Sequence, residues 1–158
     1  MKKVLLSVLT FIGLTAAVNA QDISNNAIGL RLGYNDDYGG ELSYQRSLSQ
    51  NNRLELDLGW RNSKSIHAFK LAGIYQWVWQ IEDRLNWYAG VGGGMGSWNN
   101  SLDNSGTFIF VAGDIGIEYN LNEAPIQLSL DVRPELGGNG YFKNNYGSDI
   151  AIGIRYQF

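Results

Sequence analysis

The chain has 158 residues, a length that suits one domain, and it carries 12 lysines and arginines against 15 aspartates and glutamates. It contains no cysteine, which excludes disulfides and thiol chemistry, and no basic patch of the kind that binds nucleic acid. Twenty glycines stand beside 5 Trp, 9 Tyr and 6 Phe residues, a combination that is unusual in helix-rich soluble domains.

The first element is the segment MKKVLLSVLTFIGLTAAVNAQ. Lys2 and Lys3 precede an apolar stretch over residues 4–17, and Val18-Asn19-Ala20 ends it with small residues. This is the pattern of a secretory signal peptide, which we expect over residues 1–20 with cleavage after Ala20. A membrane anchor helix is the alternative, but the apolar stretch is short for a span. The domain proper would then be residues 21–158.

Eight later segments alternate apolar and polar residues with a period of two, which is the pattern of a β-strand with one apolar face. They are separated by turn-rich stretches of Asn, Asp, Gly and Ser, and no segment after residue 21 has a helical period. In chain order the predicted strands are 27–34, 40–46, 53–61, 69–79, 85–96, 109–119, 126–136 and 149–158.

The polar face of these strands is poorly suited to be a water-facing surface. It holds many glycines, which cover nothing, and arginines among carboxylates, which suit a buried hydrogen-bonded network. The sequence therefore predicts that this face lines the inside of a barrel, as a lumen charge network made of Arg31, Glu41, Glu55, Asp57, Arg61, Lys70, Asp114, Glu118, Asp131, Arg133, Glu135 and Arg155.

The aromatic residues of the apolar face gather near the strand ends. Tyr34, Trp60 and Phe69 fall near one end, and the other end has the larger group of Trp77, Trp79, Trp87, Tyr119, Tyr156 and Phe158. Two aromatic belts around an aliphatic band are what two membrane interfaces select, and strands of roughly 9–11 residues suit a tilted crossing of a bilayer. We therefore expect an all-β, eight-stranded antiparallel up-and-down transmembrane barrel.

The last strand, DIAIGIRYQF, places Ile150, Ile152, Ile154, Tyr156 and Phe158 on one face. This alternation with a terminal aromatic is similar to the signal that the outer-membrane assembly machinery reads. The chain thus resembles the small eight-stranded outer-membrane barrels of the OmpA/OmpX type in Gram-negative bacteria, over about residues 26–158. The resemblance implies an outer-membrane location, periplasmic termini, contact with outer-membrane lipid and lipopolysaccharide, and a monomer without a cofactor.

Three chemical readings compete with a purely structural role. The stretch GVGGGMGS lacks the spacing and the following helix of a nucleotide-binding loop. Some barrels of this size modify lipid A through a His-Ser-acid arrangement, and His67, the single histidine, lies near Ser63 and Ser65 but without a recognisable local pattern. Carboxylates at the same end could attract divalent cations, although solvated loops are the favoured interpretation for Asp36, Asp37, Asp103, Glu135 and Asp149.

The lumen charges could also line a narrow porin-like conduit. Eight strands, however, leave an interior only wide enough for side chains, so we expect interlocked ion pairs that plug it, with Arg155 near Arg31. The favoured function is a structural or interaction role through the longer connections, 97–106 and 137–148. These would face outside, and 47–52, 81–84 and 120–125 would face the periplasm.

Overall fold

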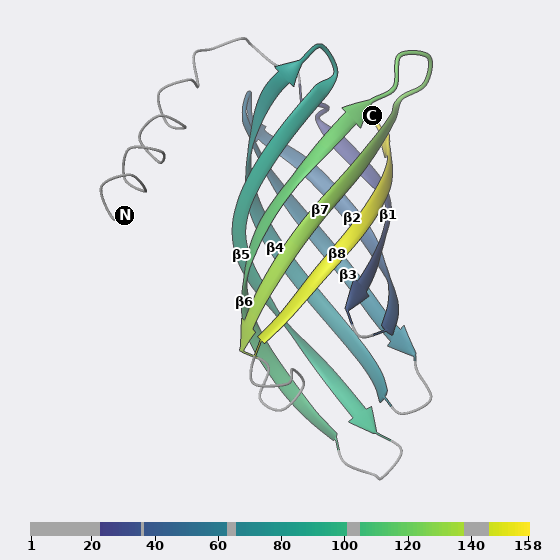
Figure 1. Ribbon diagram of the computed structural model, residues 1–158, viewed down its shortest axis with the longest axis vertical. Helices are drawn as coiled ribbons and strands as arrows, with labels where there is room; N and C mark the ends of the chain where they lie inside the picture. Colours follow the sequence, from purple (N-terminus) through teal and green to yellow (C-terminus); the bar gives the residue numbers. More distant parts are fainter. Residues whose placement is uncertain (1–22, 36, 63–65, 101–104, 138–145) are drawn as a thin grey trace, which may run out of the picture.

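The computed structural model describes residues 23–35, 37–62, 66–100, 105–137 and 146–158. Eight antiparallel strands close into a single barrel in which each strand pairs with its neighbours in sequence and the last pairs with the first (Figure 1). They are β1 Asn26–Asn35, β2 Asp37–Ser49, β3 Asn52–Asn62, β4 Ile66–Glu82, β5 Leu85–Asn100, β6 Ser105–Asn120, β7 Ile126–Gly137 and β8 Tyr146–Gln157. No helix among these residues is long and apolar enough to cross a membrane.

The two ends of the barrel differ. The short turns after β2, β4 and β6 lie at one end together with the C-terminus, and the last residues of β1, β3, β5 and β7 lie at the other. We refer to these as the turn end and the loop end. At the loop end β5 and β6 reach beyond β1 and β8 (Figure 1).

Strand lengths depart from the sequence-based expectation in one half of the barrel. β4, β5 and β6 contain 17, 16 and 16 residues, against the 9–11 expected. The predicted outer connection 97–106 is therefore wrong in its bounds, because Ser97–Asn100 continue β5 and Ser105 begins β6. The predicted connection 137–148 is too long for the same reason, since β8 begins at Tyr146. The other ends shift by at most three residues, and the predicted starts of β5 and β7 are unchanged.

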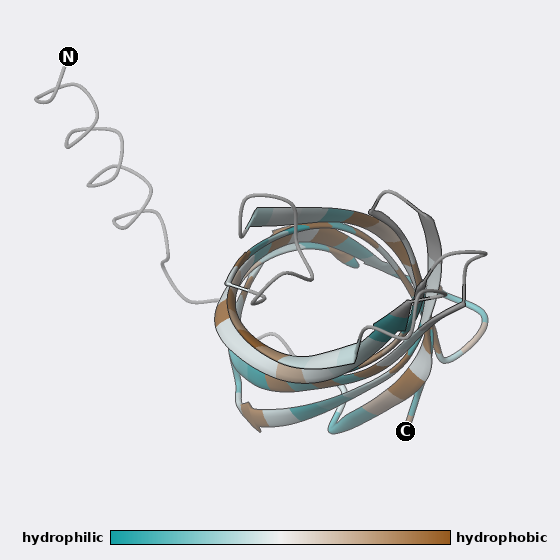
Figure 2. Ribbon diagram, turned by 90° about the horizontal axis from the view of Figure 1, so that it is seen from below, coloured by the Kyte–Doolittle hydropathy of each residue, from teal (hydrophilic) through white to brown (hydrophobic). Residues whose placement is uncertain are grey.

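The two faces of the strands are those that the alternation predicts. Seen from one end, apolar and polar residues alternate along each ribbon of the ring (Figure 2). Outward residues are large, apolar and exposed, as with Leu32 at 61%, Ile109 at 68% and Ile152 at 64%. Inward residues are buried, and most of them are polar or charged. A water-soluble barrel would have the opposite arrangement, so the fold is that of a transmembrane barrel.

Inward glycines give the lumen its capacity for long side chains. A Cβ atom on Gly116 would lie 2.6 Å from the ring of Tyr88, and one on Gly59 would lie 3.2 Å from the side chain of Glu41. Each of these glycines pairs across strands with the residue whose side chain occupies the space that a Cβ atom would take. The glycines therefore make room for the long polar side chains of the lumen.

One irregularity lies between β6 and β7. The paired residues pass from Ala112 with Glu135 directly to Ile115 with Val132. Pro134 lies in this gap, and because it has no N–H group it cannot donate a bond to the ladder.

Candidate functional site

The candidate site is the network of charged side chains inside the barrel. Among the described residues it contains five cations and eight carboxylates, and all but Lys70 are less than one-tenth exposed. Its members come from β1, β2, β3, β4, β6, β7 and β8, while β5 contributes Tyr88 and Asn86 as hydrogen-bond donors to Asp131 and Glu118. The network therefore involves every strand.

Arg133 is the central cation, because it reaches across the barrel from β7 to β3. Its side chain is fully buried, and its two terminal nitrogens lie 2.7 Å from a carboxylate oxygen of Glu55 and 2.7 Å from one of Asp57. Asp114 at 3.5 Å and Glu41 at 3.8 Å complete the surrounding negative charge. β3 and β7 are four strands apart in a ring of eight, so this pair spans the full width of the lumen.

Two further cations form bridges toward the loop end. Arg31 on β1 pairs with Glu41 at 2.9 Å, with Asp149 at 2.6 Å and with Asp131. Lys70 on β4 pairs with Glu41 at 3.1 Å and with Glu135, across the lumen on β7, at 2.8 Å. Glu41 accepts hydrogen bonds from both Arg31 and Lys70, and so connects the ion pairs of these two cations.

The remaining cations act toward the turn end. Arg155 on β8 donates to Glu55 at 3.1 Å and to the hydroxyls of Ser43 and Ser129. Arg155 pairs in register with Gly29, two residues from Arg31, as the closure of β8 on β1 requires. Arg53 on β3 lies 2.6 Å from Glu118 and donates to Gln76.

A small apolar cluster covers part of the wall at the loop end. It consists of residues from β4, β5 and β6, namely Ala72, Ile74, Phe108, Phe110, Ala112 and the partly buried Trp98. The ammonium group of Lys70 lies 5.5 Å from the ring centroid of Phe110, which connects this cluster to the charged network through a cation–π contact.

The structure brings together eleven of the twelve lumen residues named from the sequence, and the side chain of Arg61 lies outside the described part. Sequence reasoning missed two members, Arg53 and Asp149. Both share the alternation of their strands with Glu55 and Arg155, so the pattern contained the signal. The interpretation of Asp149 as a solvated loop residue is wrong, because it is 5% exposed and is bonded to Arg31. Glu135 is likewise buried and paired with Lys70.

The residues of the predicted C-terminal signal all point outward from β8. Ile150, Ile152, Ile154, Tyr156 and Phe158 are each at least half exposed, and the rings of Tyr156 and Phe158 are stacked at 6.3 Å. Phe158 also exchanges two backbone hydrogen bonds with Asn26, of 2.9 and 3.0 Å. The terminal aromatic thus takes part in closing the barrel at the turn end.

The other predicted aromatic belt residues at the turn end also lie outward, and Trp79 and Trp87 stack across strands with centroids 4.4 Å apart. His67 lies outward at the loop end, opposite Asn62 and Asn99. Ser63 and Ser65, which the sequence places near His67, lie outside the described residues, as do Asp36 and Asp103 of the carboxylates that could attract divalent cations. Among the described residues no group of three or more His, Asp or Glu side chains could hold a metal ion.

Comparison with solved structures places this fold in the class of small transmembrane β-barrels. The N-terminal barrel domain of Pseudomonas aeruginosa OprF superimposes with a TM-score of 0.68 at 13% identity, over 85% of this chain and 98% of that one. Neisserial surface protein A superimposes with a TM-score of 0.64 at 12% identity, over 84% of this chain and 94% of that one. Ail, the attachment invasion locus protein of Yersinia pestis, superimposes with a TM-score of 0.54 at 15% identity, over 85% of this chain and 97% of that one.

A de novo designed transmembrane barrel matches as well, with a TM-score of 0.58 at 20% identity, over 89% of this chain and all of the design. No protein-family model and no curated protein sequence matches the chain. The structural matches show that the chain has the fold of an eight-stranded barrel of the outer-membrane type. At these sequence identities the likeness concerns the fold alone.

Proposed function

We propose that the protein is a non-enzymatic, integral outer-membrane barrel with a sealed lumen, which serves as a rigid support for the connections at its loop end. In this proposal the turn end and both termini lie in the periplasm, after export by the predicted signal peptide. Lipid and lipopolysaccharide surround the outward face, and the assembly machinery inserts the chain as a monomer.

The observation that supports a sealed lumen is the set of ion pairs that cross it. Arg133–Asp57 spans opposite walls, and Lys70–Glu135 and Arg53–Glu118 each join strands three places apart. In a barrel of eight strands the interior is only as wide as the side chains that fill it. Solute passage would require several of these buried pairs to separate together, and each separation would leave charges in a poorly hydrated space.

The rigid support follows from the same network, because its bridges tie non-adjacent strands together. Strand hydrogen bonds fix neighbours only, whereas Arg133 and Lys70 fix the distance between opposite walls. A barrel held in this way keeps the ends of its strands in fixed relative positions. Fixed strand ends would hold the connecting segments in place for binding a partner.

Single-channel recording in planar lipid bilayers tests the sealed lumen. We expect at most rare, small openings from the wild-type protein. The charge-balanced double variant Arg133→Ala with Asp57→Ala removes the widest bridge and should produce a steady current. Its matched control is Arg46→Ala with Glu82→Ala, which deletes the same two kinds of charge at exposed positions of β2 and β4.

Steady, high-conductance channels from the wild-type protein would contradict the proposal and would favour a porin-like conduit instead. A double variant that stays as closed as the control would show that the ion pair is not the barrier. Lipid A mass spectra from cells with and without the gene test the non-enzymatic part, since a deacylase or acyltransferase would change the number of acyl chains.

A further inference from the structure

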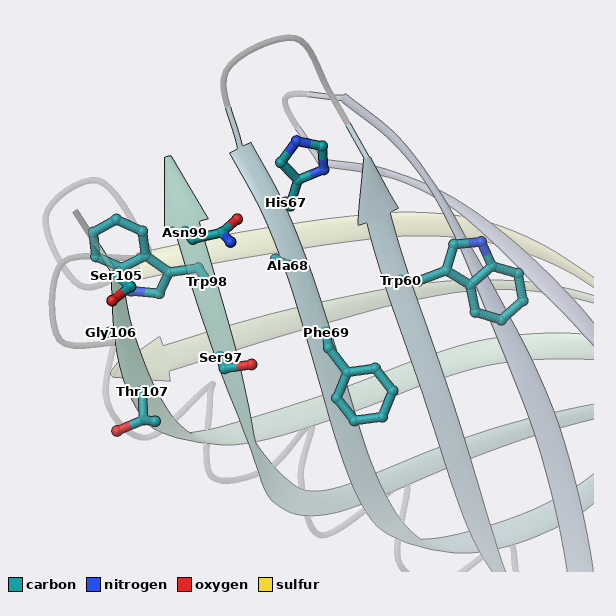
Figure 3. Close-up of a pocket in the computed structure, with 10 residues that line it drawn as sticks. All are labelled: Trp60, His67, Ala68, Phe69, Ser97, Trp98, Asn99, Ser105, Gly106 and Thr107. Atoms are coloured by element: carbon teal, nitrogen blue, oxygen red, sulfur yellow. The ribbon is translucent and has the colours of Figure 1, made fainter. Parts of the chain in front are cut away.

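The outward surface at the loop end carries a second feature, an open depression over β3–β6 (Figure 3). Its outward side chains come from two cross-strand rows. One row runs Trp60, Phe69, Ser97, Thr107, and the row nearer the strand ends contains His67, Asn99 and Ser105. Strands rather than connections hold all of these residues, so their relative positions are fixed by backbone hydrogen bonds.

The side chains of the depression combine aromatic surface with uncharged hydrogen-bonding groups. Trp60 and Phe69 are about half exposed, at 52% and 49%, and neighbour each other in register. The hydroxyls of Ser97, Ser105 and Thr107 and the amide of Asn99 are exposed beside them. No lysine, arginine, aspartate or glutamate is among the described residues that line it. Hydroxyls and amides each donate and accept, and aromatic rings cover C–H surface, which is the chemistry that a sugar ring requires.

The next row toward the middle of the barrel determines what kind of molecule fits. It consists of Leu71, Met95 and Ile109, which are 45%, 60% and 68% exposed and belong to the lipid-facing surface. From the middle of the barrel outward, the rows are therefore apolar, then aromatic with hydroxyl, then polar, over five residues of each of β4, β5 and β6. A molecule that follows this gradient has hydrocarbon chains joined to a carbohydrate head.

Figure 3 shows how the labelled groups are arranged. Trp60 and Phe69 project from neighbouring strands on one side of the depression, and Ser97 and Asn99 follow on the next strand, with Thr107 and Ser105 beyond them. Trp98, which belongs to the lumen face, lies against Gly106, where a Cβ atom would be 3.1 Å from the indole nitrogen. The inner apolar cluster thus supports the floor of the depression from behind.

We propose that this depression binds the carbohydrate headgroup of a glycolipid of the outer leaflet, with the acyl chains on Leu71, Met95 and Ile109. The proposal rests on the membrane orientation proposed above, which puts the loop end at the outer surface. A soluble saccharide alone would leave the apolar row unused, and a phospholipid without sugar would leave the hydroxyl and amide rows without partners. The site is thus specific for the junction between sugar and chain.

The experiment uses the full protein reconstituted in nanodiscs of phosphatidylcholine that contain either lipid A or phosphatidic acid at equal amounts. Lipid that stays bound after transfer to detergent is counted by native mass spectrometry. Lipid A should be retained, and phosphatidic acid, which has chains and phosphate but no sugar, should not. The variant Ser97→Ala with Asn99→Ala should lower lipid A retention about tenfold, as expected from two lost hydrogen bonds.

Ser148→Ala is the matched control, because it removes an outward serine hydroxyl from β8, the strand across the barrel from β4. Trp60→Ala provides a second variant that leaves the hydroxyl row intact and should also weaken retention. Equal retention of phosphatidic acid and lipid A, or equal retention by the double variant and the control, would overturn the inference. A barrel that inserts and stays closed yet fails this test would leave the proposed function intact, whereas a barrel that conducts steadily would contradict that function alone.

Discussion

Replacement of Arg133 by methionine tests the energetic role of the network most directly. The guanidinium of Arg133 is fully buried and faces Glu55 and Asp57 at 2.7 Å each, with Asp114 and Glu41 within 3.8 Å. Methionine fills much of the same volume but leaves these carboxylates without their common partner. Removal of one partner from a buried pair costs about 3–5 kcal/mol, since the other charge remains desolvated.

We expect a loss in the lower half of that range for Arg133→Met. Glu55 keeps Arg155 at 3.1 Å, and Glu41 keeps Arg31 and Lys70. Among the described residues, only Asp57 and Asp114 lose the one cation that pairs with them. The loss should therefore be about 3 kcal/mol, dominated by the two aspartates. Arg133→Lys, which retains the charge but not the two-pronged geometry, should fall between this variant and the wild type.

Urea unfolding of the protein in lipid vesicles, followed by tryptophan fluorescence, measures the free energy of unfolding. Arg46→Met is the control, because it makes the same substitution at an exposed position of β2 and should change stability by no more than about 0.5 kcal/mol. If Arg133→Met were as stable as Arg46→Met, the pairs across the lumen would contribute nothing net, and the reasoning from burial and distance would be refuted.

Two further predictions concern the membrane. Leu56→Arg or Ile115→Arg, on the outward face at mid-strand, should each lower the free energy of unfolding in a bilayer by about 2–4 kcal/mol. Leu48→Arg, near the turn end of β2, should cost much less. Equal costs in vesicle unfolding experiments would exclude a lipid-facing surface. Protease added to intact cells should cut only in connections of the loop end, such as 101–104 or 138–145, and never at 50–51, 83–84 or 121–125; cleavage confined to the second group would reverse the orientation.

The assignment of residues to the two faces was predictable because it depends only on alternation within each strand. Glu55 and Leu56 illustrate this, since one residue of offset separates a fully buried carboxylate from a side chain that is 41% exposed. No knowledge of neighbouring strands is needed for such a statement. The eight strands and the closed barrel followed from the same pattern.

The partners within the lumen were not predictable, because they depend on strand stagger and on the curvature of the ring. Asp131 lies two residues from Arg133 on the same face of β7, yet Asp131 binds Arg31, and Arg133 binds carboxylates on β3. The extra length of β5 and β6 was missed for another reason. Ser97, Asn99 and Ser105 have the composition of turn residues, but here their side chains face away from the lumen on paired strands.

The seam between β1 and β8 has a kinetic consequence. It joins Asn26 to Phe158 and Tyr34 to Ile150, residues from opposite ends of the described chain, so its contacts are the most distant in sequence that the fold contains. Until they form, a curved sheet of strands has two open edges, whose unpaired N–H and C=O groups are available to any other strand. Contacts of such separation form slowly. Closure of the seam is therefore the folding step at which the chain is most exposed to mispairing. A factor that covers both open edges until Phe158 pairs with Asn26 would act at this step.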